Sequence, residues 1–372
     1  MKYLGPQKGM FVLVIIGLLF SCGTEEPVSN DDPRALTLEV NVAEDGSGMV
    51  SIEASALNAI SYALYIDSDD ELLAESIAGN FEYTFLRTGI YQISVRAYGL
   101  SGRYIRESLQ VEVLVGNEVA IDDGYISALS YEGYDLVWND EFEGTSVKPE
   151  NWIFEIGTGC PNCGWGNNEL EYYRKENATV GNGVLTIEAK KENYQGMDYT
   201  SARMISKNLR SFQYGRIDIR ALLPKGKGIW PALWMLGNNI NSAGWPECGE
   251  IDIMEMIGGV GKDNTTHGTI HWGVDGNHAS SGGKYSLQSG IMADEYHVFS
   301  IIWDESSIVW LMNDQEFYTL SITPASMSEF HQQFFFIMNV AVGGNWPGSP
   351  DSSTVFPQKM KVDYVRVFQK QN

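Results

Sequence analysis

The sequence predicts an all-β protein in which a small antiparallel β-sandwich is followed by a much larger β-sandwich or jelly roll. Three observations support this prediction. Short runs of alternating apolar and polar residues recur along the chain, Gly-rich loops and turn residues separate them, and no helical period of useful length appears. The chain has 372 residues, which exceeds one ordinary domain and suits two.

The first 34 residues have the pattern of a targeting signal followed by a flexible tether. In residues 1–21, two lysines precede the apolar stretch Met10–Phe20, which is too short to span a bilayer as a helix and is typical of a secretory signal. The sequence LFSC (19–22) resembles the bacterial lipobox, which implies cleavage before Cys22 and acylation at that residue. Residues 22–34 are polar and acidic and predict a flexible tether. We expect a cell-envelope protein that contacts the membrane only through this lipid anchor and is exposed at the outer-membrane surface. Plain secretion is the alternative.

Residues 35–117 predict the small sandwich, because six short runs are separated by turns at the spacing of such a fold. These runs are ALTLEVNV, MVSIEAS, SYALYID, FEYTFL, YQISVRAY and LQVEVLV. The tripeptide Gly89-Ile90-Tyr91 resembles the tyrosine corner of immunoglobulin-like domains. The segment as a whole resembles the polycystic-kidney-disease-type modules of secreted polysaccharidases, which implies a spacer or weak binding module. Residues 118–133 are expected to be a linker.

Residues 134–370 predict the large sandwich. Strand-like runs separated by Gly-rich loops continue to the end of the chain, without long helices. These runs are GVLTIEAKK, GRIDIRALL, EIDIMEMI, HVFSIIW, SIVWLMN, FFFIMNVAV and KVDYVRVF.

Charge and cysteine content limit the partners. The net charge of −23 argues against nucleic acid, which needs a Lys/Arg surface, and disfavours anionic polysaccharides. A neutral ligand and solubility outside the cell are compatible with it. Four cysteines are too few for a disulfide scaffold of this length. Cys160 and Cys163 are expected to form a local disulfide, with a metal site as the weaker alternative, and Cys248 is expected to be buried and inert.

The segment WPECGEIDIME (245–255) contains three acids on one predicted strand. Side chains alternate between the faces of a strand, so Glu250 and Asp252 share a face while Glu255 would point away. One extra residue, a β-bulge near Met254, would return Glu255 to the same face.

Three acids on one face suit glycoside hydrolysis. A retaining enzyme needs a nucleophilic carboxylate and a carboxylic acid about 5–5.5 Å apart, and close like charges keep the acid protonated. The E-x-D-x-x-E spacing alone is weak evidence, because solvated strand faces often carry alternating acids. The apolar residues between the acids, and Trp230, Trp234 and Trp245 upstream, favour a sugar-binding groove.

These motifs resemble glycoside hydrolase family 16, in its laminarinase-like (endo-β-1,3-glucanase) branch, over roughly residues 134–369. The resemblance depends on ordered matches: WNDEF (138–142), GNNELEYY (166–173), TSAR (200–203), YGR (214–216), LPKG (223–226), WPALWML (230–236), WPECGEIDIME (245–255), HGTIH (267–271), NVAVGG (339–344), WPG (346–348) and VDYVR (362–366).

The resemblance implies a β-jelly roll with an open cleft and assigns residues by position. Glu250 would be the nucleophile, Asp252 its assisting carboxylate and Glu255 the general acid/base. The implied substrate-binding residues are Asn168, Arg203, Trp230, Trp234, Trp245, His271 and Asn339. A structural Ca²⁺ would be held by backbone oxygens of Glu141 and Gly183 and by the Asp363 carboxylate. The alternatives are that Trp234 is a core residue, that Asn339 only braces a strand and that Asp363 is an ordinary surface acid.

The resulting hypothesis is a monomeric, retaining endo-β-glucanase that needs no cofactor for catalysis. Its partner would be a neutral β-glucan with internal β-1,3 linkages, or with mixed β-1,3/1,4 linkages. Another β-linked polysaccharide such as agarose is an alternative, as are a transglycosylase and a non-catalytic β-glucan-binding surface lipoprotein. Because binding relatives in this family have lost the catalytic acids, the presence of Glu250 and Glu255 favours the enzyme.

Overall fold

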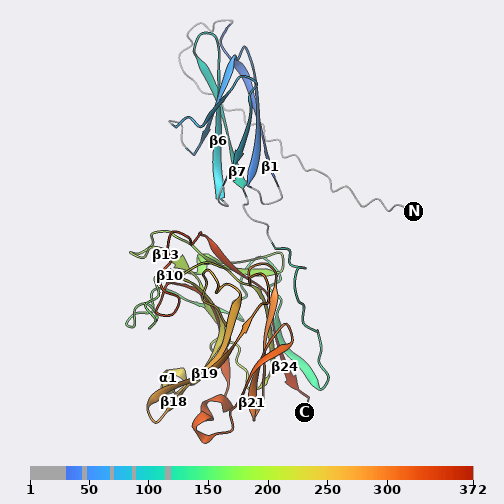
Figure 1. The fold of residues 1–372 in the computed structure, drawn as a ribbon, viewed down its shortest axis with the longest axis vertical. Coiled ribbons are helices and arrows are strands. Elements are labelled where there is room, and N and C mark those ends of the chain that lie inside the picture. Colours follow the sequence, from blue (N-terminus) through green and yellow to red (C-terminus); the bar gives the residue numbers. More distant parts are fainter. Residues whose placement is uncertain (1–30, 44–47, 68–70, 86–88, 114–118, 372) are drawn as a thin grey trace, which may run out of the picture. The chain divides into compact units, whose positions relative to one another are not determined.

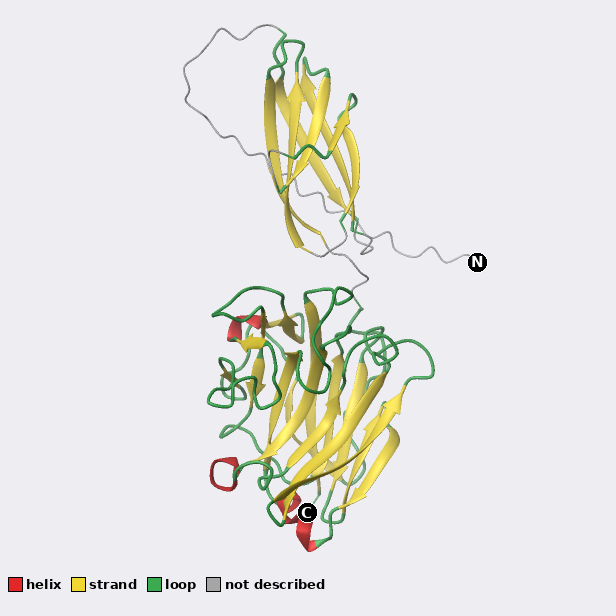
Figure 2. Cartoon of the chain, turned by 60° about the vertical axis from the view of Figure 1, so that its left-hand side comes forward, coloured by secondary structure: helices red, strands yellow, loops and turns green. Residues whose placement is uncertain are grey.

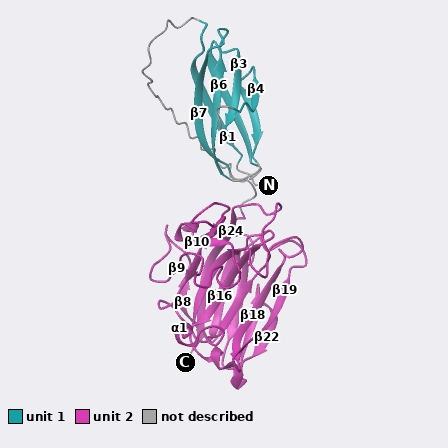
Figure 3. Cartoon of the chain, turned by 90° about the vertical axis from the view of Figure 1, so that its left-hand side faces the viewer, with its two compact units in different colours: residues 1–118 teal, residues 119–372 magenta. Residues whose placement is uncertain are grey.

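The computed structural model describes residues 31–43, 48–67, 71–85, 89–113 and 119–371. The chain divides into two compact units, residues 1–118 and 119–372 (Figures 1 and 3). Nearly every described element is a strand (Figure 2), which confirms the predicted all-β class. No helix in the described ranges is long and apolar enough to cross a bilayer. The predicted signal segment and Cys22 lie outside the described residues.

The first unit contains two antiparallel sheets, in the orders β1-β2-β5 and β4-β3-β6-β7. Their inward-facing residues, such as Ile52 and Val95, are fully buried in one apolar cluster. Six strands coincide with the six predicted runs, while the three-residue β4 is too short to show an alternating pattern. The strands are β1 (Arg34–Val42), β2 (Met49–Leu57), β3 (Ser61–Ile66), β4 (Ala74–Ser76), β5 (Asn80–Thr84), β6 (Gly89–Tyr98) and β7 (Tyr104–Val113).

The second unit is built on an eight-stranded and a seven-stranded sheet. The larger sheet runs β11-β12-β24-β15-β20-β21-β22, and β8 pairs with one end of the long strand β24. Its strands are β8 (Tyr134–Asp140), β11 (Ala178–Gly181), β12 (Val184–Ala189), β15 (Gly215–Leu222), β20 (His297–Trp303), β21 (Ser307–Met312), β22 (Gln315–Ser321) and β24 (Gln358–Lys370).

The seven-stranded sheet holds the candidate site and runs β19-β18-β17-β16-β23-β14-β9. Its strands are β9 (Ile153–Glu155), β14 (Arg203–Ile205), β16 (Ile229–Gly237), β17 (Glu250–Glu255), β18 (Thr265–Val274), β19 (Asn277–Ser286) and β23 (Phe334–Val342). Apolar residues of both large sheets, Ile251 and Ile219 among them, form one buried cluster between the sheets. The remaining elements are β10 (Glu171–Tyr173), β13 (Tyr199–Ser201), the short helix α1 (Ile240–Ala243) and the 3₁₀ turns η1 (Lys175–Asn177) and η2 (Ala325–His331).

Strand β16 contains Pro231 although it lies in the middle of the sheet, where proline normally removes a ladder hydrogen bond. The carbonyl of Pro231 accepts a hydrogen bond from the Met256 amide, on the side of β17. A proline's missing N–H points to the same side as its carbonyl, and β17 has already ended at Glu255 there. The proline therefore costs the sheet no bond with β17.

The predicted linker 118–133 differs from the structure, because residues 119–133 belong to the second unit. The Arg220 guanidinium is fully buried and needs acceptors. Three of them are backbone carbonyls of this segment, at Ile121, Asp123 and Tyr125, at 2.7–2.9 Å. The segment is therefore packed against the sheet rather than free. Strand β1 likewise begins at Arg34, the last residue of the predicted tether.

Burial of His297 on β20 predicts a loss of stability in mild acid. Burial lowers its pKa from 6.5 to about 4, so the folded unit keeps this imidazole neutral. As the pH falls below 6.5, His297 becomes protonated in the unfolded chain, whereas in the folded chain it stays neutral until about pH 4. The difference of about 2.5 pH units corresponds to about 3 kcal/mol of unfolding free energy, lost progressively through that window.

Urea unfolding of wild type and His297→Gln between neutral pH and about pH 4 tests this expectation. All 10 tryptophans lie between residues 138 and 346, so tryptophan fluorescence reports on the second unit alone. The wild type should lose more stability than the variant as the pH falls. Parallel losses in the two proteins would contradict the assignment to His297.

Candidate active site

The three predicted catalytic acids lie on β17, and a β-bulge places them on one face. Across β16, Trp234 is opposite Asp252 but Leu233 is opposite Met254, so Ile253 is the extra residue. The bulge was predicted near Met254 and is found one residue earlier. Directly opposed residues share a face of a sheet. Glu255 is opposite Ala232, two positions from Trp234, and therefore lies on the same face as Asp252.

The three carboxyl groups repel one another in a water-poor site. Burial raises the pKa of Glu250 well above the usual range, and the nearby charge of Asp252 raises it further. Burial also raises the pKa of Asp252 well above its usual range, and the charge of Glu255 adds to that shift. Burial also raises the pKa of Glu255, while the Trp230 indole N–H, 2.9 Å from Glu255 Oε1, acts in the opposite direction. Because so many negative charges cannot coexist here, the cluster retains a proton near neutral pH. A protonated acid and a charged carboxylate on one face can perform acid-base and nucleophilic chemistry together.

Trp245 and His271 flank the Glu250 end of the cluster. The Trp245 indole N–H donates to Glu250 Oε2 at 3.0 Å, while 49% of the residue remains exposed. His271 lies opposite Glu250 on β18, with its Nε2 3.2 Å from Asp252 Oδ2 and 3.8 Å from Glu250 Oε1. The other ring nitrogen, Nδ1, is 2.8 Å from Nε2 of His278 on β19. Trp245 and His271 were predicted as substrate-binding residues, but none of these contacts was anticipated from the sequence, and His278 was not among the predicted residues.

Trp234 is held in place by a buried polar chain. Its indole N–H donates to Asn339 Oδ1 at 2.8 Å, and Asn339 Nδ2 donates to the Tyr173 hydroxyl at 3.0 Å. Tyr173 in turn donates to Glu169 at 3.1 Å. Asn339 is only 4% exposed, and both ends of its amide are engaged. Asn339 was predicted to line the groove, with a bracing role as the alternative. In the structure its buried amide braces Trp234. Trp234 itself is half-buried on the groove face.

Arg203 lies further along the same face, on β14. Its guanidinium is stacked between the rings of Trp165 and Trp234, 4.6 and 4.8 Å from their centroids. Its Nε donates to Glu155 on the edge strand β9 at 2.5 Å.

Beyond Arg203, a recess of 560 Å³ is lined by Trp165, Glu155 and the loop that carries Cys160. Cys160 and Cys163 form the expected disulfide, so the loop borders the β9 end of the sheet. Cys248 is free and buried, and burial raises its pKa to about 12.

A second aromatic group lies at the Glu255 end of the cluster. Trp346 is 40% exposed, and its ring lies 5.7 Å from that of Trp230 and 5.0 Å from that of His267. Trp346 belongs to the WPG motif (346–348), but no role was predicted for it from the sequence. Asn168 is exposed and donates to Asn345 Oδ1 at 2.7 Å, in the loop that precedes Trp346. The structure therefore places Asn168 at the rim rather than with the acids.

The predicted calcium ligands lie together around β24. Glu141 directly follows β8 and Gly183 directly precedes β12, the two strands that pair with β24 on either side of Asp363. The Glu141 carboxylate is paired with Arg366, which leaves only its backbone oxygen for a metal ion. Burial raises the pKa of Asp363, one oxygen of which accepts from Arg220 at 2.7 Å. This donor set fits an oxygen-ligated Ca²⁺ that would brace the fold, and the site stays a prediction.

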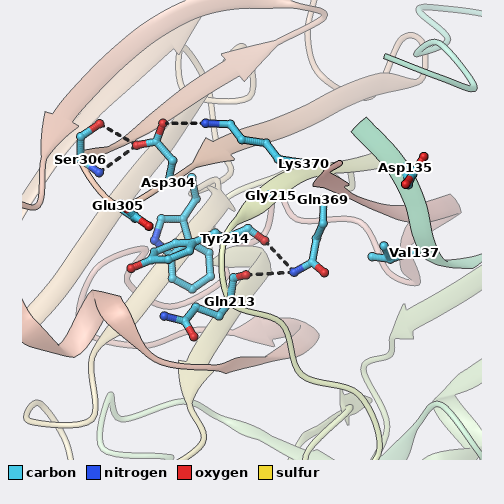
Figure 4. A pocket seen from close by; sticks show the side chains of 11 residues that line it. Asp135, Val137, Gln213, Tyr214, Gly215, Asp304, Glu305, Ser306, Gln369 and Lys370 are labelled. Atoms are coloured by element: carbon cyan, nitrogen blue, oxygen red, sulfur yellow. Dashed lines mark hydrogen bonds and ion pairs between the residues drawn. The ribbon is translucent and has the colours of Figure 1, made fainter. Parts of the chain in front are cut away.

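One recess of the second unit lies away from the candidate site. Its volume is 660 Å³, and it lies at the ends of β15, β20 and β24, in the eight-stranded sheet (Figure 4). Its polar groups bond one another: Gln369 donates to the carbonyl of Gln213, and Asp304 accepts from Ser306 and Lys370 (Figure 4). No predicted catalytic, substrate-binding or metal residue lines it.

Comparison with known proteins agrees with the site geometry. The family model for glycosyl hydrolases family 16 matches residues 166–366. The chain is 41% identical over 239 residues to the clotting factor G alpha subunit of Tachypleus tridentatus, which covers 63% of the chain but only 34% of that protein. It is 39% identical over 277 residues to a beta-glucanase of Rhodothermus marinus, which covers 71% of the chain and 94% of the relative.

Among solved structures, the catalytic domain of an endo-1,3-beta-glucanase (laminarinase) from Thermotoga petrophila is 47% identical, with a TM-score of 0.60. The match covers 65% of this chain and all of that domain. More than half of the chain is matched by the family model, and the match includes all three acids of β17. This chain belongs to glycoside hydrolase family 16 and is a glycoside hydrolase.

Proposed function

We propose that the chain is a retaining endo-β-glucanase that hydrolyses internal β-1,3 linkages of laminarin-type glucans. The observation that supports this most strongly is the bulge at Ile253, which aligns Glu250, Asp252 and Glu255 between the Trp245 and Trp230 indoles. The exposed faces of Trp245 and Trp346 at the two ends of this row suit stacking on pyranose rings.

The proposed reaction is a double displacement. Glu250 attacks the anomeric carbon while Glu255 protonates the departing glycosidic oxygen, which gives a covalent glycosyl-enzyme and a shortened glucan. Glu255, now a carboxylate, then removes a proton from water as the water attacks the same carbon and releases Glu250. Asp252 shares a proton with its neighbours and so keeps Glu250 charged when Glu255 is protonated. The Trp245 N–H holds one oxygen of Glu250, which leaves the other to attack.

The choice of β-1,3-glucan is supported by two observations. Similar proteins include a beta-glucanase of Rhodothermus marinus and an endo-1,3-beta-glucanase of Thermotoga petrophila. The net charge of −23, with Arg203 already paired to Glu155, offers little attraction to a sulfated chain.

Reducing-sugar release and product length on laminarin, lichenan and agarose test this proposal. We expect oligosaccharides of several lengths from laminarin at the earliest times, as internal cleavage requires, and less or no product from agarose. Activity on lichenan would add mixed β-1,3/1,4 linkages to the substrate range. Failure on both glucans would overturn the substrate assignment.

We further propose that the protein is lipid-anchored at Cys22 and exposed at the outer-membrane surface, on the evidence of the signal-like residues 1–21 and the acidic tether. Metabolic labelling with an alkyne fatty acid should label the wild type and not Cys22→Ser. Equal labelling of both proteins would exclude this anchor.

A further inference from the structure

We propose that Glu250, Asp252 and His271 form a binding site for one Zn²⁺-like cation, and that its occupation reversibly blocks the hydrolytic site. The binding claim depends only on the geometry of these side chains. The inhibition claim also depends on the proposed glucanase function, so the two are tested by separate measurements below.

The positions of the three ligand atoms suit a small cation. His271 Nε2 lies 3.2 Å from Asp252 Oδ2 and 3.8 Å from Glu250 Oε1, and all three atoms are within 4.8 Å of one another. Zinc bonds of about 2.0–2.2 Å in a tetrahedron separate neighbouring ligands by roughly 3.4 Å. Small side-chain rotations are therefore enough to place all three atoms around one ion, with a fourth position left for water.

An independent observation concerns the hydrogen bonding of the buried Asp252 carboxylate. Asp252 is only 2% exposed, and its Oδ2, which points into the cluster, makes no well-aligned hydrogen bond with any described residue; its polar neighbour is His271 Nε2, 3.2 Å away. Leaving a buried carboxylate oxygen without a donor is costly. A bound cation would satisfy this oxygen and would remove the repulsion between Asp252 and Glu250.

The surrounding groups already orient the ligands toward one centre. The Trp245 N–H holds Glu250 Oε2 at 3.0 Å, which leaves Oε1 facing His271. His278 Nε2 lies 2.8 Å from His271 Nδ1, and its ring packs 4.8 Å from that of Trp245. When His271 donates its Nδ1–H to His278, its Nε2 lone pair is free to bind a metal. Such outer partners fix the tautomer of metal-binding histidines.

The donor chemistry selects the cation. One imidazole and two carboxylates suit Zn²⁺ and its first-row neighbours, whereas Ca²⁺ and Mg²⁺ prefer six or more oxygen ligands. Within the described residues, this is the one group of three such side chains that meets the distance condition. An ion bound to Glu250 Oε1 occupies the atom that would attack the sugar, so the cation and the glucan exclude each other.

Calorimetric titration of Zn²⁺ into the untagged, chelator-treated chain tests the site directly. We expect one site in the wild type, at least tenfold weaker binding in His271→Asn, and a loss of about 10–100-fold in His278→Gln through the outer partner. His267→Asn is the matched control, since His267 lies on β18 and faces the same groove but is not part of the cluster. It should bind Zn²⁺ within about twofold of the wild type, because no proposed ligand or outer partner is lost.

Zn²⁺ binding by folded His271→Asn with wild-type affinity would overturn the site, as would competition from Ca²⁺ at equal concentration. If His271→Asn fails to fold, His278→Gln and Asp252→Asn carry the same test. In activity assays, Zn²⁺ should raise the apparent KM for laminarin and leave kcat unchanged; no effect at saturating Zn²⁺ would overturn the inhibition claim. A wild type that binds Zn²⁺ at this site but never cleaves glucan would contradict the proposed function and not the site.

Discussion

Replacing Glu250 with serine is expected to abolish hydrolysis of laminarin while leaving glucan binding intact. A serine hydroxyl is shorter than the carboxylate and carries no charge, so it cannot form the glycosyl ester or stabilise the developing cation. The fold should tolerate the change, because the Glu250 side chain is 17% exposed and its removal relieves repulsion with Asp252. The exposed Trp245 indole loses one acceptor that water can replace.

Reducing-sugar assays and calorimetric binding of laminarin-derived oligosaccharides measure the two halves of this expectation. Glu247→Ser is the matched control, since Glu247 is exposed, lies three residues away and is not among the residues that hydrogen-bond or ion-pair with the acids of the cluster. The control should retain activity. Full activity of Glu250→Ser would remove Glu250 from the reaction.

Glu255→Ala is expected to slow laminarin hydrolysis by about 10²–10⁴-fold, the usual contribution of a general acid/base. The loss should depend on the leaving group, because an aryl glycoside that leaves easily does not need protonation. Added azide should then restore turnover and yield a β-glycosyl azide, since it attacks the glycosyl-enzyme without needing a general base. This pattern follows from the position of Glu255 on the same face as Glu250, on the far side of the bulge.

The identity of the azide product distinguishes the two glutamates. Glu250→Ser has no glycosyl-enzyme to intercept and should give no β-azide. The anomeric configuration is read by ¹H NMR. Glu255 would be excluded as the acid/base if Glu255→Ala lost hydrolytic activity equally on aryl glycosides and on laminarin and if azide restored neither.

The arrangement of the acids could be predicted because it is local. Alternation on a strand fixes the faces of Glu250 and Asp252, and the extra residue between Asp252 and Glu255 requires a bulge if all three act together. The all-β class is local in the same way, since each run shows its own alternation. The bulge at Ile253, rather than near Met254, depends on which residues oppose one another across β16.

Other features depend on long-range pairing, which one sequence does not show. Strand β16 was not among the predicted runs because Pro231 interrupts its pattern. In β18 and β19 burial alternates, but the residues TTHGTIHWGV and NHASSGGKYS show little alternation of apolar and polar types. The contact between His271 and His278 follows from the register of the β18–β19 hairpin, where they are diagonal neighbours. The brace made by Asn339 likewise requires Tyr173, which is distant in sequence and reaches Asn339 only in the fold.

The configuration of the first reducing end formed from a laminarin oligosaccharide, followed by ¹H NMR, tests the central claim most directly. Double displacement through Glu250 and Glu255 predicts that the β-anomer appears first and that the α-anomer follows only by mutarotation. Initial release of the α-anomer would mean direct attack by water and would contradict the assigned roles of the two glutamates.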